Sequence, residues 1–345
     1  MKAAVYEGIE RIVLREVPVP ELTENEILIK IKCCAICGTD LRIYHHGNPT
    51  VVPPTITGHE LSGVITKTGK NVKNFKEGER VTIATSIPCL ECPACRKRQY
   101  NICDNLKGIG YQYQGGFAEY MKVPEQALKA DYLLKLPEGV SFEEASLSEP
   151  FACVINGQGL SGVKKGDIVL IIGAGPIGAM HVALAKINGA TKVILADLIP
   201  ERLDLAKQLP VDYLINTSQK ELKEEVMKIT EGQGADVVIV AVPSSKAQEE
   251  GLAVTAKRGR LNLFGGLPKT NPTTAFNTNL IHYREIFVHG SYGSVADQQR
   301  KALQLFAEKR IDAKKFISLT LPIEKIIEGY HISEEKRVYR VVITL

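Results

Sequence analysis

The chain has 345 residues, with 43 basic and 39 acidic side chains and a formal net charge of +4. This bias is too small to indicate nucleic acid or a membrane surface as a partner. A hydrophobic fraction of 44% with 24% charged residues is typical of a globular protein and excludes disordered, collagen-like and coiled-coil chains. No apolar run approaches the ~18 residues of a membrane span, and Lys2 interrupts any secretory apolar core. We therefore expect a cytoplasmic protein, with a length that suits two domains.

The first 150 residues contain short β-type runs separated by Gly, Pro and Asn, which predict an all-β domain. The runs lie at 27–31, 64–66, 80–83 and 118–123. After residue 150, apolar runs alternate with amphipathic stretches. The predicted strands are 168–172, 192–196, 213–215, 237–242, 260–264 and 286–289, and the predicted helices are 177–187, 200–209, 222–230 and 247–256. Strands this apolar are covered on both faces, so this part is predicted to be a doubly wound parallel sheet. A helix at 298–309 and a strand at 338–343 could belong to either domain.

A glycine-rich turn follows the first of these parallel strands. Gly173, Gly175 and Gly178 have the G-x-G-x-x-G spacing of a dinucleotide-binding turn, and Ile177 lies within it. The first glycine allows a tight turn, the second lets a pyrophosphate approach the backbone, and the third lets helix and strand pack closely. A glycine-rich turn without a ligand is the alternative.

The next predicted strand ends in a carboxylate. Asp197 lies 19 residues (197 − 178) beyond the third glycine, near the spacing of about 20 at which an acidic residue meets the adenosine ribose. A carboxylate there repels a 2′-phosphate, so NAD is favoured over NADP. Arg202 could stack on adenine or accept a phosphate. The alternative for Asp197 is a helix N-cap before Pro200.

Four of the eight cysteines fall within fifteen residues, at Cys89, Cys92, Cys95 and Cys103. Four thiolates form a closed tetrahedral zinc site that folds a loop and leaves no position for a substrate. An iron–sulfur cluster and a nucleic-acid zinc module are the competing interpretations. A second, dispersed set consists of Cys37, His59, Glu60 and Glu149, which are the residue types of a catalytic zinc site. Their spacing alone does not pair them.

The motifs together resemble the zinc-containing medium-chain alcohol dehydrogenases, especially their polyol (sorbitol or iditol) branch and secondly the threonine and butanediol dehydrogenases. The resemblance covers essentially the whole chain. It rests on Cys37-Gly-Thr-Asp40, Gly58-His59-Glu60, the four clustered cysteines, Gly-Gly-Phe-Ala-Glu-Tyr at 115–120, Glu149-Pro150 and the turn at 173–178.

The resemblance implies a GroES-like catalytic domain at 1–150, completed by 291–345, and an inserted NAD-binding Rossmann domain at 151–290. It implies two zinc ions per chain: a structural ion on the four clustered cysteines and a catalytic ion on Cys37 and His59, with Glu60 or Glu149 completing the shell. Neighbouring residues on a regular strand point to opposite faces, so His59 and Glu60 can both bind one metal only if the backbone turns there. Asp40 is expected to orient the His59 ring.

The reaction implied is oxidation of a secondary alcohol by hydride transfer to NAD, with zinc as Lewis acid. Thr39 is the candidate first proton acceptor. Many relatives carry a histidine five residues after the cysteine ligand, and it passes the substrate proton onward. This chain has Arg42 there, which cannot release its proton, so His45, His46 or solvent could carry the proton beyond Thr39 instead. Arg42 could instead bind an anionic substrate or a cofactor phosphate.

Other expected contacts lie later in the nucleotide domain. Gly265 and Gly266 are expected to pass along the nicotinamide, and Tyr44 and Tyr292 could contact the substrate. The predicted substrate is a polyol or sugar derivative. Threonine and 2,3-butanediol are the enzymatic alternatives, although threonine enzymes have a histidine where this chain has Ser86. A non-catalytic NAD-binding member of the family is a remote alternative. Relatives form dimers and tetramers, so a homo-oligomer is expected. Cys33, Cys34 and Cys153 are left over as small core residues.

Overall fold

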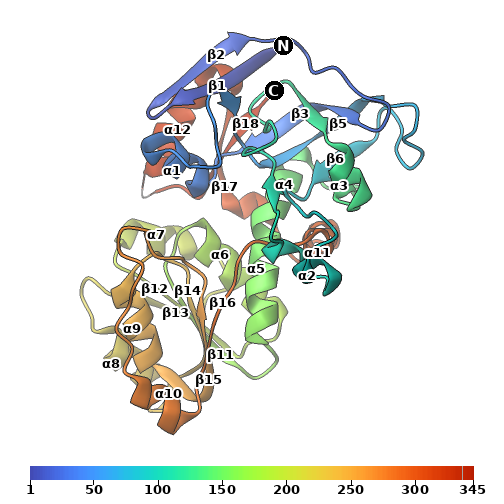
Figure 1. The fold of residues 1–345 in the computed structure, drawn as a ribbon. Helices are drawn as coiled ribbons and strands as arrows, with labels where there is room; N and C mark the ends of the chain where they lie inside the picture. Colours follow the sequence, from blue (N-terminus) through green and yellow to red (C-terminus); the bar gives the residue numbers. More distant parts are fainter. Residues whose placement is uncertain (336) are drawn as a thin grey trace. The chain divides into compact units, whose positions relative to one another are not determined.

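The computed structural model describes residues 1–335 and 337–345, which form two compact units (Figure 1). Unit 1 consists of Met1–Cys153 and Gly293–Leu345, and unit 2 of Val154–Tyr292. No helix in this described part of the chain is long and apolar enough to cross a membrane.

Unit 1 is built mainly from two antiparallel-rich sheets. The small sheet has the order β2 (Arg11–Glu16), β1 (Lys2–Gly8), β4 (Thr55–Ile56). The larger sheet has the order β10 (Leu133–Lys135), β6 (Arg80–Ile83), β5 (Glu60–Thr68), β3 (Ile27–Ala35), β18 (Arg340–Thr344), β17 (Ile317–Pro322), and β9 (Tyr120–Val123) also pairs with β3. In Figure 1 the red C-terminal strand β18 lies beside the blue strand β3, because the two strands pair antiparallel. The C-terminal segment therefore completes the N-terminal sheet.

Helices interrupt the strands of unit 1, so the expectation of an all-β first half was wrong. The longest helix that lies wholly within residues 1–150, α1 (Gly38–His46), begins directly after β3. The others are α2 (Pro93–Arg96), α3 (Glu125–Lys129), α4 (Phe142–Ser146), α11 (Ala296–Ala307) and α12 (Ile326–Glu334). A two-stranded pair, β7 (Ser86–Ile87) with β8 (Lys107–Gly108), flanks the cysteine-rich loop. Helix α5 (Ser148–Ser161) contains the boundary between the two units.

Unit 2 is a six-stranded, all-parallel sheet with helical crossovers, as predicted. The strand order is β13 (Tyr213–Asn216), β12 (Lys192–Asp197), β11 (Ile168–Ile172), β14 (Ala235–Val240), β15 (Thr255–Leu263), β16 (Phe287–Gly290). In order of appearance this is 3-2-1-4-5-6, the Rossmann arrangement. The helices are α6 (Pro176–Ile187), α7 (Pro200–Ala206), α8 (Leu222–Ile229), α9 (Ser245–Ala253) and α10 (Thr278–Arg284).

The strands of unit 2 are as apolar in the structure as in the sequence. Val169, Leu170 and Ile171 on β11 are fully buried, and β14 contributes a similar run. Strand β15 starts five residues earlier than predicted, at residue 255 instead of 260, because the exposed Lys257 and Arg258 conceal its start. Successive strands are added toward one edge of the sheet from β11 to β13 and toward the other edge from β14 to β16. The order therefore reverses between β11 and β14, and ligands bind at this position in such folds.

Candidate functional site

Cys37 lies at the N-terminus of α1, in a geometry that Asp40 fixes. The backbone N–H of Cys37 donates to Asp40 Oδ2 at 2.9 Å, closing a capping box around the first turn. Asp40 is only 1% exposed. Its other oxygen, Oδ1, lies 3.5 Å from Nδ1 of His59, so this carboxylate links the start of α1 to the histidine.

The backbone turns immediately before His59. Gly58 has a φ of +91°, in the left-handed region that favours glycine. A Cβ there would lie 2.8 Å from the Cys34 sulfur and the Phe117 ring, so a larger residue would not fit. Glu60, the next residue, opens β5. His59 lies between this turn and the first residue of β5, outside the regular strand, so the alternation of faces does not separate it from Glu60.

Cys37, His59 and Glu60 form a metal-type cluster. One ligand atom from each lies within 4.8 Å of the others, and His59 and Glu60 are buried. Oε1 of Glu60 accepts a 2.7 Å hydrogen bond from Arg340, while Oε2 is buried without a partner among the described residues. A buried carboxylate oxygen without a donor is costly unless a cation is bound, so the donor set fits a zinc ion.

The protonation of His59 depends on its neighbours. Burial lowers the pKa of His59, but the carboxylate of Asp40 and the thiolate of Cys37 raise it, and the net pKa lies well above the usual value. A metal ion binds only the neutral ring, so zinc would displace the proton that these anions attract.

Glu149, on α5, lies outside this cluster of three. Its Oε1 accepts hydrogen bonds from Thr85 at 3.4 Å and from the Cys153 thiol at 3.9 Å. Burial raises the pKa of Glu149 to about 7, an effect that the charge of His59 opposes and that of Glu60 reinforces. The carboxyl group therefore lies in the electric field of the cluster without joining its ligand atoms.

Thr39 and Arg42 contact each other on α1. Arg42 donates a 2.8 Å hydrogen bond to the Thr39 hydroxyl, which keeps its own proton free for another acceptor. Both ring nitrogens of His45 face carboxylates, those of Glu10 and Glu334. The ring of Tyr44 packs edge-on against Tyr330, with centroids 5.4 Å apart.

The four clustered cysteines come together in one lobe. The Cys89 and Cys103 sulfurs are 3.5 Å apart, Cys92 and Cys103 3.9 Å, and Cys89 and Cys95 4.0 Å. Four sulfurs placed tetrahedrally at ~2.3 Å from zinc would be about 3.8 Å apart, so the cluster has the size of a zinc site. All eight cysteines are free thiols. The backbone N–H groups of Glu91 and Cys92 lower the pKa of Cys89 to about 6, whereas burial raises the pKa of Cys95 to about 12 and also raises that of Cys103.

The glycine-rich turn of unit 2 is shaped as its sequence predicts. Gly173 has a φ of +109°, and a Cβ on Gly178 would lie 1.7 Å from the Gly173 carbonyl oxygen. A Cβ on Gly175 would meet nothing within 4 Å, so space is open on the side where a phosphate would approach. Gly175 is the N-cap of α6, which directs the helix N-terminus to this space.

Asp197 ends β12 and is held by the backbone. Its Oδ2 accepts from the N–H of Ala174 at 2.6 Å, and its Oδ1 accepts from the N–H of Ile199 at 2.8 Å. The Arg202 guanidinium lies 4.0 Å from Oδ2. Asp197 therefore joins the glycine-rich turn to the start of α7 rather than capping that helix, whose N-cap is Ile199.

The remaining predicted residues of unit 2 differ in their surroundings. A Cβ on Gly265 would lie 2.5 Å from the Val242 carbonyl carbon, whereas one on Gly266 would meet nothing within 4 Å. Tyr292 is 66% exposed.

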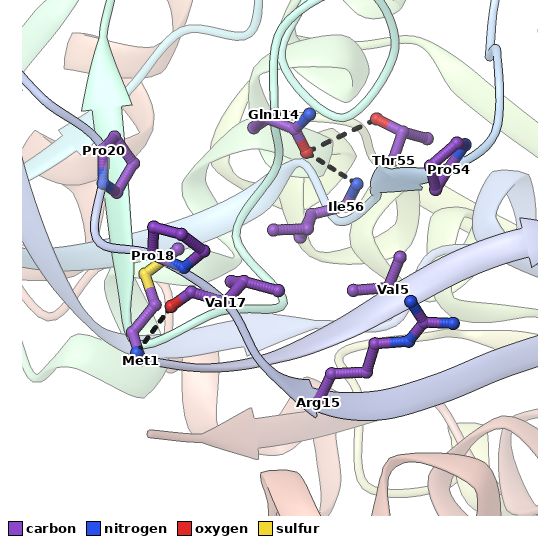
Figure 2. A pocket seen from close by; sticks show the side chains of 10 residues that line it. All are labelled: Met1, Val5, Arg15, Val17, Pro18, Pro20, Pro54, Thr55, Ile56 and Gln114. Atoms are coloured by element: carbon purple, nitrogen blue, oxygen red, sulfur yellow. Dashed lines mark hydrogen bonds between the residues drawn. The ribbon is translucent and has the colours of Figure 1, made fainter.

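Sequence reasoning missed two residues beside the metal-type cluster. Arg340 comes from the last strand, and its Nη2 lies 3.8 Å from the Cys37 sulfur besides bonding Glu60. Tyr111 places its ring 6.0 Å from that of His59, centroid to centroid. Neither residue belongs to a local motif, so only the fold reveals them. A separate pocket of about 340 Å³ in unit 1 is lined by other residues, from Met1 and Val5 to Gln114 (Figure 2).

Comparisons with known proteins identify the family of the chain. Residues 23–138 match the alcohol dehydrogenase GroES-like domain family, and residues 176–308 match the zinc-binding dehydrogenase family. The chain is 33% identical to a sorbitol dehydrogenase of Halalkalibacterium halodurans, over 100% of this chain and 99% of that protein. It is 38% identical to an L-threonine 3-dehydrogenase of Pyrococcus horikoshii, over 81% of this chain and 79% of that protein. The solved structure of the alcohol dehydrogenase TADH from Thermus sp. ATN1 superposes with a TM-score of 0.92 at 30% identity, covering 100% of this chain and 99% of the other.

Proposed function

The chain belongs to the zinc-containing alcohol dehydrogenase family, and we propose that it oxidises a secondary alcohol, a polyol or sugar derivative, to the ketone with NAD. The main support for the proposal is the buried cluster of Cys37, His59 and Glu60. Oε2 of Glu60 is buried without a hydrogen-bond donor, and a bound cation would compensate its charge. When bound, zinc supplies Lewis-acid catalysis and NAD accepts the hydride.

Residues of unit 1 have distinct roles in this proposal. Cys37, His59 and Glu60 hold the catalytic metal, and Asp40 orients the imidazole of His59. Glu149 either joins the metal or holds a water beside it. Thr39 is the first acceptor of the substrate proton. Because Arg42 donates to the same hydroxyl, Thr39 has a fixed orientation, but Arg42 cannot itself accept the proton.

Further residues are proposed to bind the cofactor and a second metal ion. The turn at Gly173, Gly175, Ile177 and Gly178 binds the pyrophosphate of NAD, with Asp197 on the ribose, Arg202 near the adenine, and Gly265 and Gly266 along the nicotinamide. Cys89, Cys92, Cys95 and Cys103 hold a second, structural zinc. This reading assigns the catalytic role to the expected domain 1–150 with 291–345 and NAD binding to 151–290.

A second candidate substrate is L-threonine, which the 38% identity to a threonine dehydrogenase favours. A 2,3-diol is the third. Arg42, Tyr44 and Tyr292 are the proposed substrate contacts. We further propose a homo-oligomer and a cytoplasmic location, the latter because thiolate metal sites need reduced cysteines.

A substrate panel with metal analysis tests the proposal. Polyols, sugar acids, diols and threonine are each offered with NAD and with NADP, and formation of reduced cofactor is followed. We expect two zinc ions per chain and turnover with at least one secondary alcohol. Cys37→Ser should lose one zinc and at least about 10³-fold in kcat, since the Lewis acid is gone.

The matched control is Cys33→Ser, which changes a buried thiol four residues earlier that lies outside the cluster. It should keep both zinc ions. A Cys37→Ser protein that remained fully active without the second metal would contradict the mechanism. A zinc-loaded protein that bound NAD but oxidised nothing would favour the non-catalytic alternative.

A further inference from the structure

The loop that follows the cysteine lobe places a tyrosine beside the metal-type cluster. Tyr111 is half-buried, and its ring lies 6.0 Å from the His59 ring at a tilt of 44°. The same ring packs against the buried side chains of Tyr6, Ile43 and Val51. Tyr111 is therefore held between an apolar cluster on one side and a predicted metal ligand on another.

The backbone of this loop is fixed to the segment that leads into His59. Gly115, Gly116 and Phe117 donate backbone hydrogen bonds of 2.7, 2.8 and 3.1 Å to the carbonyl groups of Ile56, Gly58 and Thr57. Figure 2 shows the side chain of Gln114 accepting hydrogen bonds from Ile56 N and the Thr55 hydroxyl. Because the loop and His59 share this anchor, the position of Tyr111 relative to His59 is set by the fold.

The loop also closes on itself around Tyr111. Gly110 donates to the Tyr113 carbonyl at 2.8 Å, and Tyr113 donates to the Gly108 carbonyl at 3.0 Å. A Cβ on Gly110 would lie 3.0 Å from the Gly58 carbonyl oxygen, so the loop lies directly against the turn before His59. These contacts fix the backbone on both sides of Tyr111 against the segment that leads into His59.

The Tyr111 hydroxyl has no hydrogen-bond partner among the residues that the structure describes. A phenol hydroxyl can both donate and accept a hydrogen bond. A phenol without a partner, in a loop anchored beside a predicted metal site, has the chemistry of a substrate contact.

We propose that Tyr111 is a specificity-determining residue whose hydroxyl binds a second hydroxyl of the substrate, on the carbon next to the one oxidised. The inference rests on the proposed function and narrows its substrate class to vicinal diols and polyols. A site built to bond a hydroxyl discriminates against the analogue that lacks it, because the phenol is then left unpaired.

The test compares 2,3-butanediol with 2-butanol, two secondary alcohols that differ in one adjacent hydroxyl. Tyr111→Phe keeps the ring and removes only the hydroxyl. We expect kcat/KM for the diol to fall about five- to twentyfold, mainly through KM, while kcat/KM for 2-butanol changes less than about twofold. Zinc content should be unchanged. The matched control is Tyr113→Phe, a half-buried tyrosine of the same loop, which should leave both substrates unaffected.

Each result decides the inference. Equal losses on both alcohols would show that Tyr111 positions the metal site instead, and no loss on either would show that its hydroxyl contacts no substrate. If Tyr111→Phe lowered kcat/KM for threonine but not for the diol, the Tyr111 hydroxyl would not bind a second substrate hydroxyl, and the inference would be contradicted. These outcomes require an active wild-type protein, so they leave the proposed function standing. A wild-type protein that oxidises nothing in the panel contradicts the proposed function itself.

Discussion

The two carboxylate oxygens of Glu60 have different surroundings: one is bonded to Arg340 and the other has no partner in the described structure. Its side chain is fully buried, and Arg340 donates to one oxygen at 2.7 Å while the other oxygen has no partner in the described structure. Arg340 also lies 3.8 Å from the Cys37 sulfur, so one guanidinium faces two of the three predicted ligands. Arg340 thus balances part of the negative charge that the predicted ligands gather, in the absence and in the presence of a metal.

We predict that Arg340→Met strongly destabilises the zinc-free protein. The substitution leaves the Glu60 carboxylate buried and unpaired, which costs about 3–5 kcal/mol. Urea unfolding after chelation measures the loss. Arg300→Met is the matched control, because Arg300 pairs with Asp131 at the surface and should lose no more than ~1 kcal/mol. Similar losses for the two variants would show that Arg340 and Glu60 act as an ordinary surface pair.

A second prediction at this scale concerns Asp197 and the choice of cofactor. Asp197→Asn removes the negative charge but keeps a carbonyl oxygen for one of the two backbone N–H groups. The ratio of kcat/KM for NADP to that for NAD should rise about tenfold, equivalent to ~1.4 kcal/mol, because repulsion of a 2′-phosphate is lost. Asp204→Asn, a surface change near Lys207, should leave the ratio as it was. A wild-type preference for NADP would refute the role given to this carboxylate.

Among the elements, the cysteine lobe is the one that we expect to depend most on a bound ion. Its helix α2 has four residues and its 3₁₀ turn, Tyr100–Ile102, has three, lengths too short to be stable alone. The buried hydrophobic cluster of the lobe contains Cys92, Cys95 and Cys103 themselves. The predicted ligands are thus also the core of the lobe, and a zinc ion bound there would supply folding free energy that larger side chains supply elsewhere.

The elements also show what sequence can and cannot predict. Strand β11 was predicted to the residue, since a buried parallel strand is marked by its own apolar run. Helix α1 was missed because its nine residues, with a buried Asp40 at the start and two histidines at the end, carry no clear apolar face. The turn at Gly58 could not be predicted, since the close approach of Phe117 and Cys34, which leaves no room for a Cβ there, comes from residues distant in sequence. Arg340 and Tyr111 join the site only through long-range pairing of strands and loops.

At the scale of the whole molecule, the predicted functions are divided between the units. Both cysteine-containing clusters, at 37–60 and 89–103, consist of residues of unit 1, whereas the glycine-rich turn and Asp197 belong to unit 2. No residue of Val154–Tyr292 is in either cluster. The residues predicted to bind metal and those predicted to bind the dinucleotide therefore belong to different units.

Removing zinc should consequently separate the two functions. After dialysis against a chelator, we expect turnover to disappear and unit 1 to lose stability, while affinity for NADH, followed by nicotinamide fluorescence, changes less than about threefold because unit 2 keeps its turn and Asp197. Circular dichroism is the control that checks whether the metal-free protein is still folded. Adding zinc back should restore turnover. A folded, metal-free protein that no longer binds NADH would show that the dinucleotide site depends on the metal sites. That result would refute the division of functions between the units, because metal loss would then act through residues of unit 2 as well.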